Sequence, residues 1–510
     1  MLNFKKALTA EDFYRVLFEN EPVEIDNSTI SKLEKSFDFL KDFSQNKIIY
    51  GVNTGFGPMA QYKIEDKDRI QLQYNLIRSH ATGAGGVLDE ISVKALMLAR
   101  LNTLCLGKSG IHTSVAKTMV ALLNQNITPV IFEHGGVGAS GDLVQLAQLA
   151  LVLIGEGEVF FEGKRVSTKD VFEKLNISPI EVKIREGLAL INGTSAMTGI
   201  GIVNLIHAQR LLNWSVFASS VINEIVQAYD DHLSEELNSA KLHSGQQIIA
   251  EMMRNHLSDS GLTRDRNEHL YNEDADKNFY FEEKVQEYYS LRCVPQILGP
   301  VYDSLQNSFK ILIEEVNSAN DNPIIDVDSE HVYHGGNFHG DYVSLEMDKL
   351  RLVMTKTSML AERQLNYLLN SRLNNILPPF VNLAKLGLNF GMQGAQFTAV
   401  STTAENQMLS NSMYVHSIPN NNDNQDIVSM GTNSALMTKK VIENAFEVLA
   451  VEMATIVQAL EYLEIDKKLS SVSLLKMKDF RKIIKPIKED RPLYKELDEL
   501  KVFLKNNDAY

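Results

Sequence analysis

A glycine-rich segment at residues 135–141 holds residue types that could build a reactive group from the chain itself. Ala139, Ser140 and Gly141 form its last three residues. Glycine has no Cβ, so the nitrogen of Gly141 can approach the carbonyl carbon of Ala139. Loss of water there would close a five-membered ring, and dehydration of Ser140 would add an exocyclic methylidene group. The surrounding glycines would allow the strained backbone that ring closure needs. The product, 4-methylidene-imidazol-5-one, is a strong electrophile that requires no external cofactor.

The same segment has two other interpretations. Gly136, Gly138 and Gly141 match the G-x-G-x-x-G pattern of a nicotinamide oxidoreductase, and Glu156 and Glu158 lie near the offset of its ribose-binding acid. However, a dinucleotide-binding domain alternates strands and helices through a parallel sheet, whereas here one strand is followed by helix after helix. The glycines could also serve only a tight turn, in a catalytically silent helical scaffold.

Other residues suit the deamination of an α-amino acid. This reaction needs an electrophile that captures the amine and a base that removes the β-proton. Tyr50 begins the glycine-punctuated segment YGVNTGFG, which could close like a lid. Tyr289 and Arg292 are three residues apart and so share one helix face. A guanidinium such as that of Arg292 can bind both oxygens of a carboxylate. The plainer alternatives are a packing role for Tyr50 and an ordinary salt bridge for Arg292.

Seven segments of the chain resemble the ammonia-lyases of the histidine, phenylalanine and tyrosine family, in the family's order, over roughly residues 10–465. They are YGVNTGFG (50–57), GVGASGDL (136–143), LINGTS (190–195), QEYYSLRCVPQILGP (286–300), NDNP (320–323), GGNFHG (335–340) and NQDIVSMG (424–431). The resemblance implies a small-molecule amino-acid substrate and a mainly helical homotetramer whose active sites draw residues from three chains. It implies no metal and no cofactor beyond the internal electrophile.

The resemblance also implies roles for individual residues. Ala139, Ser140 and Gly141 would form the electrophile, and Tyr50 would remove the β-proton. Arg292 would hold the substrate carboxylate. The other expected site residues are Asn322, assisting at the carboxylate; Asn192, bonding to the electrophile or the amine; Tyr289, supporting either group; Phe338, beside the electrophile; Gln286, joining the polar network; and Leu143 and Asn424, binding substrate.

The choice of amino acid depends on a few positions. Ser79 and His80 form a pair that is typical of histidine lyases. However, Gln425 stands where those enzymes carry a glutamate, and a neutral amide cannot supply the charge that pairs with an imidazole. His80 could instead bond to a phenol hydroxyl, which would otherwise be left unpaired at a cost of about 1–3 kcal/mol. Ala147 and Gln148, where relatives have a histidine or tyrosine, could also line the pocket.

Together these residues favour a tyrosine ammonia-lyase that releases 4-coumarate. The whole chain is also similar to bacterial tyrosine members of the family, which carry the same serine–histidine pair. The alternatives are a phenylalanine or histidine ammonia-lyase, or an aromatic 2,3-aminomutase.

Long helices are expected to position these residues. Four segments carry apolar residues on most faces, so other helices must bury them, which predicts a helical bundle. They are Ser195–Leu233, Val285–Glu315, Asp341–Leu377 and Thr432–Leu463. We expect a mainly α fold in two parts. Residues 1–195 would form a small mixed α/β region with the tyrosine loop and the electrophile. Residues 196–510 would form the bundle, with a charged, solvated helical tail from residue 464.

Shorter elements are expected within these parts. The pattern predicts a helix at Ser28–Phe43 and strands at Lys47–Tyr50 and Ile127–Phe132. Alternating runs in residues 156–186 (EVFFEG and IEVKIRE) predict a hairpin or small sheet. The charged residues 256–282 are expected to form an exposed connection.

Composition limits the possible partners and location. The 510 residues include 65 acidic and 50 basic side chains, a net charge of −15 that disfavours nucleic acid and anionic membranes as partners. Cys105 and Cys293 alone cannot form a disulfide framework or a cysteine-rich metal site, which suits a reducing cytoplasm. The first residues do not resemble a signal peptide, and the longest mostly apolar run, Leu143–Ile154, is too short to span a bilayer.

Overall fold

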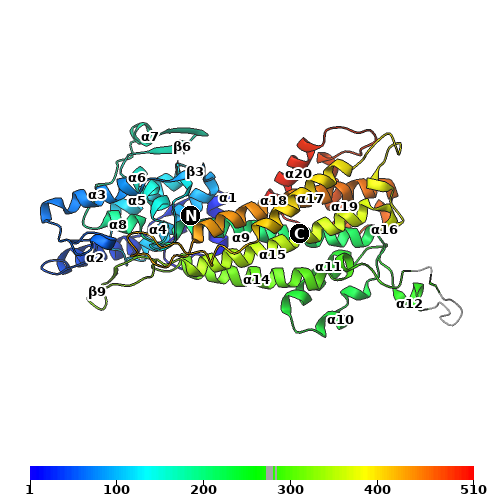
Figure 1. Cartoon of the computed structure of the whole chain (residues 1–510), viewed down its shortest axis with the longest axis horizontal. Coiled ribbons are helices and arrows are strands. Elements are labelled where there is room, and N and C mark those ends of the chain that lie inside the picture. The colour runs from blue at the N-terminus through cyan, green and yellow to red at the C-terminus, as the bar shows by residue number, and fades with distance from the viewer. Residues whose placement is uncertain (272–279, 282–283) are drawn as a thin grey trace. The chain divides into compact units, whose positions relative to one another are not determined.

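The computed structural model describes residues 1–271, 280–281 and 284–510. Long helices dominate it and its strands are few and short, which confirms the predicted mainly α fold (Figure 1). By contacts the chain divides into two compact units, each made of three stretches. The first unit comprises Met1–Ile206, Ser308–Asp348 and Ser412–Lys439, and the second comprises His207–Asn307, Lys349–Asn411 and Lys440–Tyr510. The sequence-based domain boundary at residue 195 stays a prediction.

The helices vary widely in length. They are α1 (Ala10–Phe18), α2 (Asn27–Phe43), α3 (Arg69–His80), α4 (Glu90–Cys105), α5 (Thr113–Asn124), α6 (Leu143–Leu153), α7 (Thr168–Leu175), α8 (Glu186–Ile191), α9 (Ser195–Ile225), α10 (Glu235–Ser239), α11 (Ser244–Leu257), α12 (Arg266–His269), α13 (Tyr289–Arg292), α14 (Val294–Val316), α15 (Asp341–Leu369), α16 (Ser371–Asn374), α17 (Gln393–Leu409), α18 (Gly431–Leu463), α19 (Ser471–Ile483) and α20 (Tyr494–Asn506).

In the described residues the strands form four small sheets. They are β1 (Leu2–Asn3), β2 (Val23–Glu24), β3 (Ala84–Val87), β4 (Thr128–Pro129), β5 (Phe132–His134), β6 (Glu158–Phe161), β7 (Lys164–Ser167), β8 (Ile324–Asp326) and β9 (His331–Tyr333). β1 pairs with β2 in parallel. The antiparallel pairings are β3 with β5, β4 with β6, β6 with β7, and β8 with β9. None of these sheets is the alternating parallel sheet that a dinucleotide-binding domain needs.

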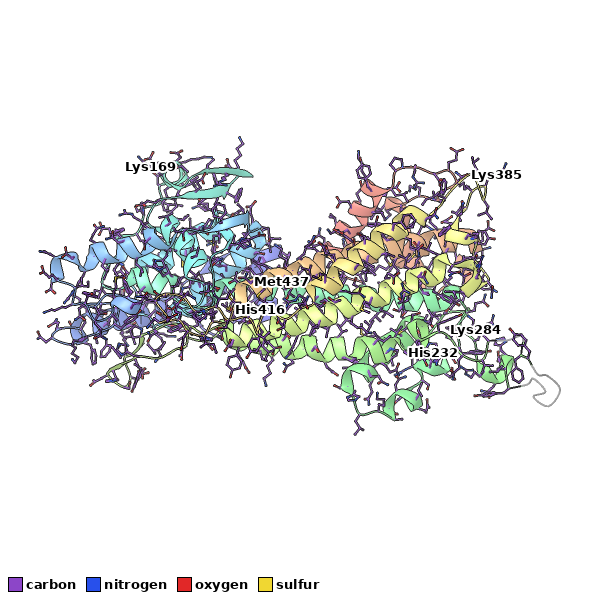
Figure 2. All side chains as sticks on the ribbon, in the orientation of Figure 1. Lys169, His232, Lys284, Lys385, His416 and Met437 are labelled. Atoms are coloured by element: carbon purple, nitrogen blue, oxygen red, sulfur yellow. The ribbon has the colours of Figure 1, made fainter. Side chains whose placement is uncertain are left out.

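The predicted hairpin is present at β6 and β7. Glu162 and Gly163 link the strands with φ of 51° and 71°. Two consecutive positive φ values make the type I′ turn whose twist suits a two-residue hairpin. α7 follows, and its Lys169 is labelled in Figure 2. The run IEVKIRE forms no strand, so that part of the prediction is wrong; α8 begins at Glu186 instead.

The predicted helix at residues 28–43 is confirmed as α2, but the strand predicted at Lys47–Tyr50 is wrong. The Asn53 side chain accepts from the nitrogen of Ile49 at 2.9 Å and donates to the carbonyl of Lys47 at 2.6 Å. These bonds use backbone groups that a strand would pair with a neighbour, so the segment folds as a loop. The strand predicted at Ile127–Phe132 is two short strands, β4 and β5, that pair with different partners.

The predicted bundle is confirmed in the long helices α9, α14, α15 and α18 (Figure 1). In the first unit, the Asn204 amide of α9 donates to the carbonyl of Ala435 in α18 at 2.8 Å. Thr438 of α18 donates to the carbonyl of Met347 in α15, also at 2.8 Å. In the second unit, a side-chain bond of 2.9 Å joins α15 to α9. Buried polar side chains thus fix how apolar helices pair within each unit.

The segment from residue 464 is not the solvated tail that was predicted. Four apolar side chains of α19 and α20 are buried: Met477, Phe480, Leu500 and Leu504. The indole nitrogen of Trp214 donates to the carbonyl of Leu504 at 3.0 Å. The charges lie on one face of two amphipathic helices, and the other face packs into the second unit.

Two further predictions concern exposed or apolar stretches. In the region predicted as an exposed connection, α11 ends at Leu257 and α12 spans Arg266–His269, while residues 272–279 and 282 lie outside the described residues. Across the part of the chain that the structure describes, no helix combines the length and the apolar character needed to cross a membrane.

Candidate active site

Ten of the fifteen predicted site residues line one cavity of about 490 Å³ in the first unit. They are Tyr50, Ser79, His80, Ser140, Leu143, Asn192, Asn322, Phe338, Asn424 and Gln425. Ala139 and Gly141 flank Ser140 in the chain. The cavity therefore gathers segments from the tyrosine loop, α3, the start of α6, the end of α8 and three later loops. No Asp, Glu, Lys or Arg is among the described residues that line it.

The glycine-rich segment is held by a short parallel pairing with residue 193. The nitrogen of Gly193 donates to the carbonyl of Ser140 at 3.2 Å, and the nitrogen of Asp142 donates to the carbonyl of Gly193 at 2.8 Å. Gly141 lies between these two bonds with φ of +70°, and a Cβ there would overlap the Gly193 carbonyl. Only glycine fits this position, and its nitrogen takes no part in the two bonds. The pairing therefore fixes the residues on either side of Gly141 without using the nitrogen that would close the ring.

Asp142 anchors the same segment to two long helices. Its Oδ2 accepts from the nitrogens of Ala196 and Met197 at the start of α9, both at 2.8 Å, and its Oδ1 accepts from the hydroxyl of Thr432 at the start of α18. A carboxylate is favoured at helix N-termini, where unpaired N–H groups converge. Complete burial nevertheless raises the pKa of Asp142 to about 6. The tripeptide is thus attached to a rigid buried support.

Tyr50 points its hydroxyl into its own loop. The hydroxyl oxygen accepts from the backbone nitrogen of Gly57 at 3.0 Å, and the ring meets Phe56 edge-on with centroids 6.1 Å apart. Since that oxygen accepts the N–H, the phenol hydrogen must point elsewhere. The nitrogen of Tyr50 also donates to Nε2 of His334 at 3.4 Å. The loop thus presents an oriented phenol, as a proton acceptor or donor must be.

His80 lies at the end of α3 with its ring tautomer fixed by the backbone. Its Nδ1 is 2.9 Å from the carbonyl oxygen of Leu76 and 3.1 Å from Oγ of Ser79. A carbonyl can only accept, so Nδ1 must carry hydrogen, and in the neutral ring Nε2 is then an acceptor. The site therefore offers a hydrogen-bond acceptor on α3.

Gln425 and Asn322 contribute neutral amides. The Gln425 amide nitrogen donates to Oγ of Ser140 at 3.0 Å. Asn322 Oδ1 accepts from the nitrogen of Gly335 at 2.8 Å, which leaves the Asn322 NH₂ group as a donor for another partner.

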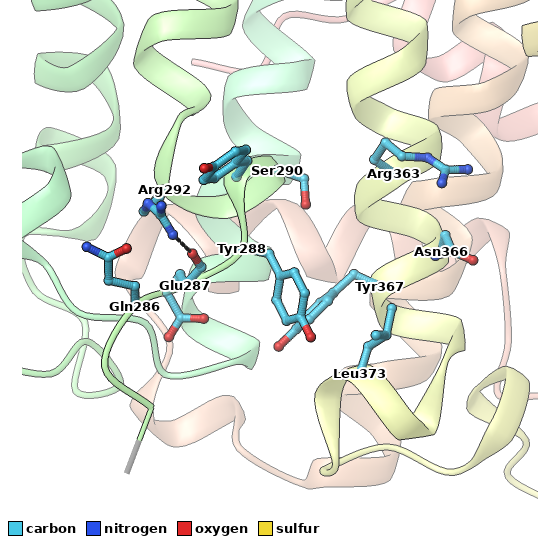
Figure 3. A pocket seen from close by; sticks show the side chains of 10 residues that line it. Gln286, Glu287, Tyr288, Ser290, Arg292, Arg363, Asn366, Tyr367 and Leu373 are labelled. Carbon is cyan, nitrogen blue, oxygen red and sulfur yellow. Dashed lines mark hydrogen bonds between the residues drawn. The ribbon is translucent and has the colours of Figure 1, made fainter. Parts of the chain in front are cut away.

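Gln286, Tyr289 and Arg292 do not line this cavity. They line a separate cavity of about 580 Å³ in the second unit, shown in Figure 3. The predicted shared helix face is confirmed, because the Arg292 guanidinium lies 4.6 Å from the centre of the Tyr289 ring on α13. Arg292 also donates to the carbonyl of Glu287 (Figure 3). The described lining of the first cavity therefore does not include the expected carboxylate-binding arginine.

The proposed pocket role of Ala147 and Gln148 is wrong. Neither residue lines the cavity. Gln148 is buried, and its Oε1 accepts from the nitrogen of Phe132 at 2.9 Å, so it supports β5.

Sequence reasoning missed the apolar wall of the cavity. Its remaining lining residues are Phe56, Gly57, Met59, Ala60, Leu72, Asn75, Leu76, Leu188, Ile191 and Asn421. One signal was available: Leu72, Leu76 and His80 follow one another at i+4 spacing and therefore share a face of α3. The contribution of α8 and of Asn421 had no comparable local signal.

Both the sequence and the fold of the chain resemble those of known proteins. Residues 8–482 match the model of the aromatic amino acid lyase family. The chain is 38% identical to histidine ammonia-lyase of Bacillus subtilis (strain 168), covering 98% of this chain and 95% of that protein. It is 38% identical to tyrosine 2,3-aminomutase of Myxococcus sp. (strain Mx-B0), covering 94% and 93%. The tyrosine aminomutase structure from Streptomyces globisporus superposes with a TM-score of 0.95 at 34% identity, covering 99% of this chain and 96% of that one.

The fold of long helices is thus shared with a tyrosine aminomutase, and the sequence is similar to that of a histidine ammonia-lyase over nearly the whole chain. The chain belongs to the aromatic amino acid lyase family. The names of its relatives refer to different amino acids, histidine and tyrosine, so the family alone does not identify the substrate.

Proposed function

We propose that the protein is an ammonia-lyase that eliminates ammonia from L-tyrosine to give 4-coumarate. The observation that carries this proposal is the fixed tautomer of His80. Its Nδ1 is committed to the carbonyl of Leu76, so Nε2 offers an acceptor, and a phenol hydroxyl is a matching donor. Phenylalanine would leave that acceptor without a partner.

The lack of charge in the cavity supports tyrosine over histidine. Gln425 is neutral, and no described lining residue is acidic. A substrate imidazolium would be buried there without a counter-charge, which is costly, whereas a neutral phenol needs only a hydrogen-bond partner. Leu72, Leu76 and Leu143 supply an apolar surface for an aromatic ring.

We propose that Ala139, Ser140 and Gly141 mature into 4-methylidene-imidazol-5-one. The fit rests on Gly141, where the positive φ and the contact with Gly193 exclude any side chain. When formed, this group supplies an electrophile for the substrate amine. The chain's other residues bind and orient the substrate and move its proton.

Each of these residues has a role that suits its geometry. Tyr50, oriented by the nitrogen of Gly57, removes the β-proton of the substrate. Asn322 donates its NH₂ group to the substrate carboxylate. Phe338 lies beside the electrophile as part of the cavity wall.

We further propose that the active protein is a homotetramer with shared sites. A substrate carboxylate needs a cation, and no Lys or Arg is among the described residues that line the cavity, which supports a site completed by Arg292 of another chain. Tyr289 is 70% exposed and so is available to a second copy. Gln286 would join the same shared site.

A 2,3-aminomutase acting on tyrosine is the second candidate. The similarity to tyrosine 2,3-aminomutases at 38% identity favours it, since the same elimination begins both reactions. The two activities differ in whether the amine leaves or returns at the β-carbon.

Substrate and product analysis tests these proposals. The protein is incubated separately with L-tyrosine, L-phenylalanine and L-histidine, and products are followed by absorbance and by chromatography for β-tyrosine. We expect 4-coumarate and ammonia in equal amounts from tyrosine. Urocanate formed from histidine in the absence of coumarate would overturn the substrate assignment. β-Tyrosine as the main early product would assign the mutase activity.

A further inference from the structure

A buried ion pair lies directly behind Asn192. The side chains of Arg185 and Asp321 are both fully buried, with nitrogen–oxygen distances of 3.0 and 3.1 Å. Burial alone would raise the pKa of Asp321, but the charges of Arg185 and Arg100 hold it below its ordinary value. Removing either of these two side chains would leave the charge of the other uncompensated in the interior. None of the roles assigned above uses this pair.

Asp321 fixes which way the Asn192 amide points. Nδ2 of Asn192 donates to Oδ1 of Asp321 at 2.9 Å and to the carbonyl of Asn322 at 3.4 Å. Both neighbours can only accept, so the reversed amide would set oxygen against oxygen. The Asn192 oxygen is therefore the side-chain atom that remains for the cavity.

The backbone of Asn192 is held as firmly. The Arg100 guanidinium donates to the carbonyl of Asn192 at 2.8 Å and to the carbonyl of Ala189. It also donates to the Asn320 side chain at 3.3 Å. Asn192 is thus fixed at its main chain and at its amide, which leaves its oxygen little freedom to turn.

Asn322 has the opposite arrangement. Its oxygen accepts a hydrogen bond from the nitrogen of Gly335, so its NH₂ group is the part that can bind a ligand. Two asparagines that line one cavity therefore present opposite polarities, an acceptor from Asn192 and a donor from Asn322. An α-amino acid carries a matching pair, because its amine donates and its carboxylate accepts.

We propose that Asp321, fixed by Arg185, is a positioning residue that aims the amide oxygen of Asn192 at the substrate amine. This inference rests on the proposed amino-acid deamination, because it needs an amine in the cavity. Asp321 itself does not line the cavity and acts only through Asn192.

Ligand binding without turnover tests the inference. In a Ser140→Ala background, which cannot form the electrophile, calorimetry gives the Kd of L-tyrosine and of 4-coumarate, which lacks the amine. Adding Asp321→Asn allows the Asn192 amide to turn. This variant should raise the Kd of tyrosine about tenfold or more and change the Kd of coumarate by less than about twofold. Equal weakening of both ligands, or no change in either, would overturn the inference.

A matched control separates positioning from loss of stability. Asp348 is another buried carboxylate of the first unit, on α15, which accepts from Ser412 and Met413. Asp348→Asn should lower the melting temperature while leaving the ratio of the two Kd values unchanged. A matching change of that ratio in both variants would assign Asp321 a purely structural role.

Two further measurements keep the test decisive. If Asp321→Asn does not fold, Arg185→Gln with Asp321→Asn removes both charges together and should show the same selective loss for tyrosine. In active enzyme, Asp321→Asn should lower kcat/KM far less in an Asn192→Ala background than alone, whereas additive effects would contradict action through Asn192. If wild type binds a different amino acid, the proposed substrate fails, and the same comparison is made with that amino acid and its deaminated acid.

Discussion

Nδ1 of His80 lies 2.9 Å from the carbonyl oxygen of Leu76, one helical turn earlier in α3. This contact converts a side chain of ambiguous polarity into a defined acceptor at the cavity. Under the proposed function, this acceptor is the group that would distinguish tyrosine from phenylalanine.

The first prediction follows from this contact. His80→Phe removes the acceptor and buries the tyrosine hydroxyl against an apolar ring. The kcat/KM for tyrosine relative to phenylalanine should therefore fall by about 10- to 100-fold. Steady-state assays with both substrates measure the ratio. An unchanged ratio would show that His80 does not contact the hydroxyl. Leu72→Val, on the same helix face, serves as the control for general cavity damage.

The second prediction concerns the electrophile. Ser140→Ala has no hydroxyl to eliminate, so it should keep its helical circular dichroism and lose turnover. Intact mass of the wild type should be lower than the sequence mass by two waters, about 36 Da, because ring closure and dehydration each release one. A wild type of full sequence mass that still turns over tyrosine would exclude the internal electrophile.

The third prediction concerns the base. Tyr50→Phe keeps the ring that packs on Phe56 and removes the hydroxyl. We expect kcat to fall by about 10²-fold or more while the melting temperature is retained. Wild-type kcat and an unchanged pH–rate profile in this variant would assign proton removal to another group.

The fourth prediction concerns sharing of sites between chains. Tyr50→Phe and Arg292→Ala damage residues of different units and should each be nearly inactive. Mixed oligomers formed by co-expression should regain part of the wild-type activity, since some sites would combine an intact Tyr50 with an intact Arg292. Light scattering gives the number of chains. Activity no higher than that of either variant alone would place Arg292 outside the shared site.

The fifth prediction concerns pH. Burial raises the pKa of Glu186 from 4.5 to about 7, although it accepts from the nitrogens of His112 and Lys183. The unfolded chain loses this proton at lower pH than the folded one, so the contribution of Glu186 to stability falls as pH rises from about 4.5 to 7. The loss should be about 3 kcal/mol over that range.

Denaturant unfolding at several pH values checks this effect. The Glu186→Gln side chain cannot ionise, so this variant should not lose that stability. The unfolding free energy of the variant minus that of the wild type should therefore increase as pH rises. A difference between the two proteins that stays constant from pH 4.5 to 7 would contradict the raised pKa.

Local chemistry was readable from the sequence alone. The Ala139–Ser140–Gly141 tripeptide, the Tyr50 loop and the Ser79–His80 pair each lie within a few consecutive residues, and all reach the cavity region. The long helices were also predictable, because their apolar pattern repeats over several turns. The glycine requirement at residue 141 gained its physical reason only from the fold, through Gly193.

Local patterns failed where a side chain outside the pattern, near or far along the chain, decided the outcome. The pattern of Lys47–Tyr50 predicts a strand, but backbone groups of this segment form hydrogen bonds with the Asn53 side chain instead of with a neighbouring strand. The charged tail from residue 464 reads as solvated, but alternate faces of α19 and α20 pack on Trp214 and its neighbours. A sequence window cannot show which partner competes for a backbone group or covers a helix face.

The sequence by itself determined the candidate electrophile tripeptide, the family and the bundle of long helices, because each depends on residue types in short or periodic patterns. Only the tertiary structure decided the polarity of the cavity. An asparagine carries a donor and an acceptor in nearly equal shapes, so its type does not say which one faces a ligand. Asp321 sets the orientation of the Asn192 amide, and it lies 129 residues from Asn192 in the chain and 2.9 Å from its amide in the fold.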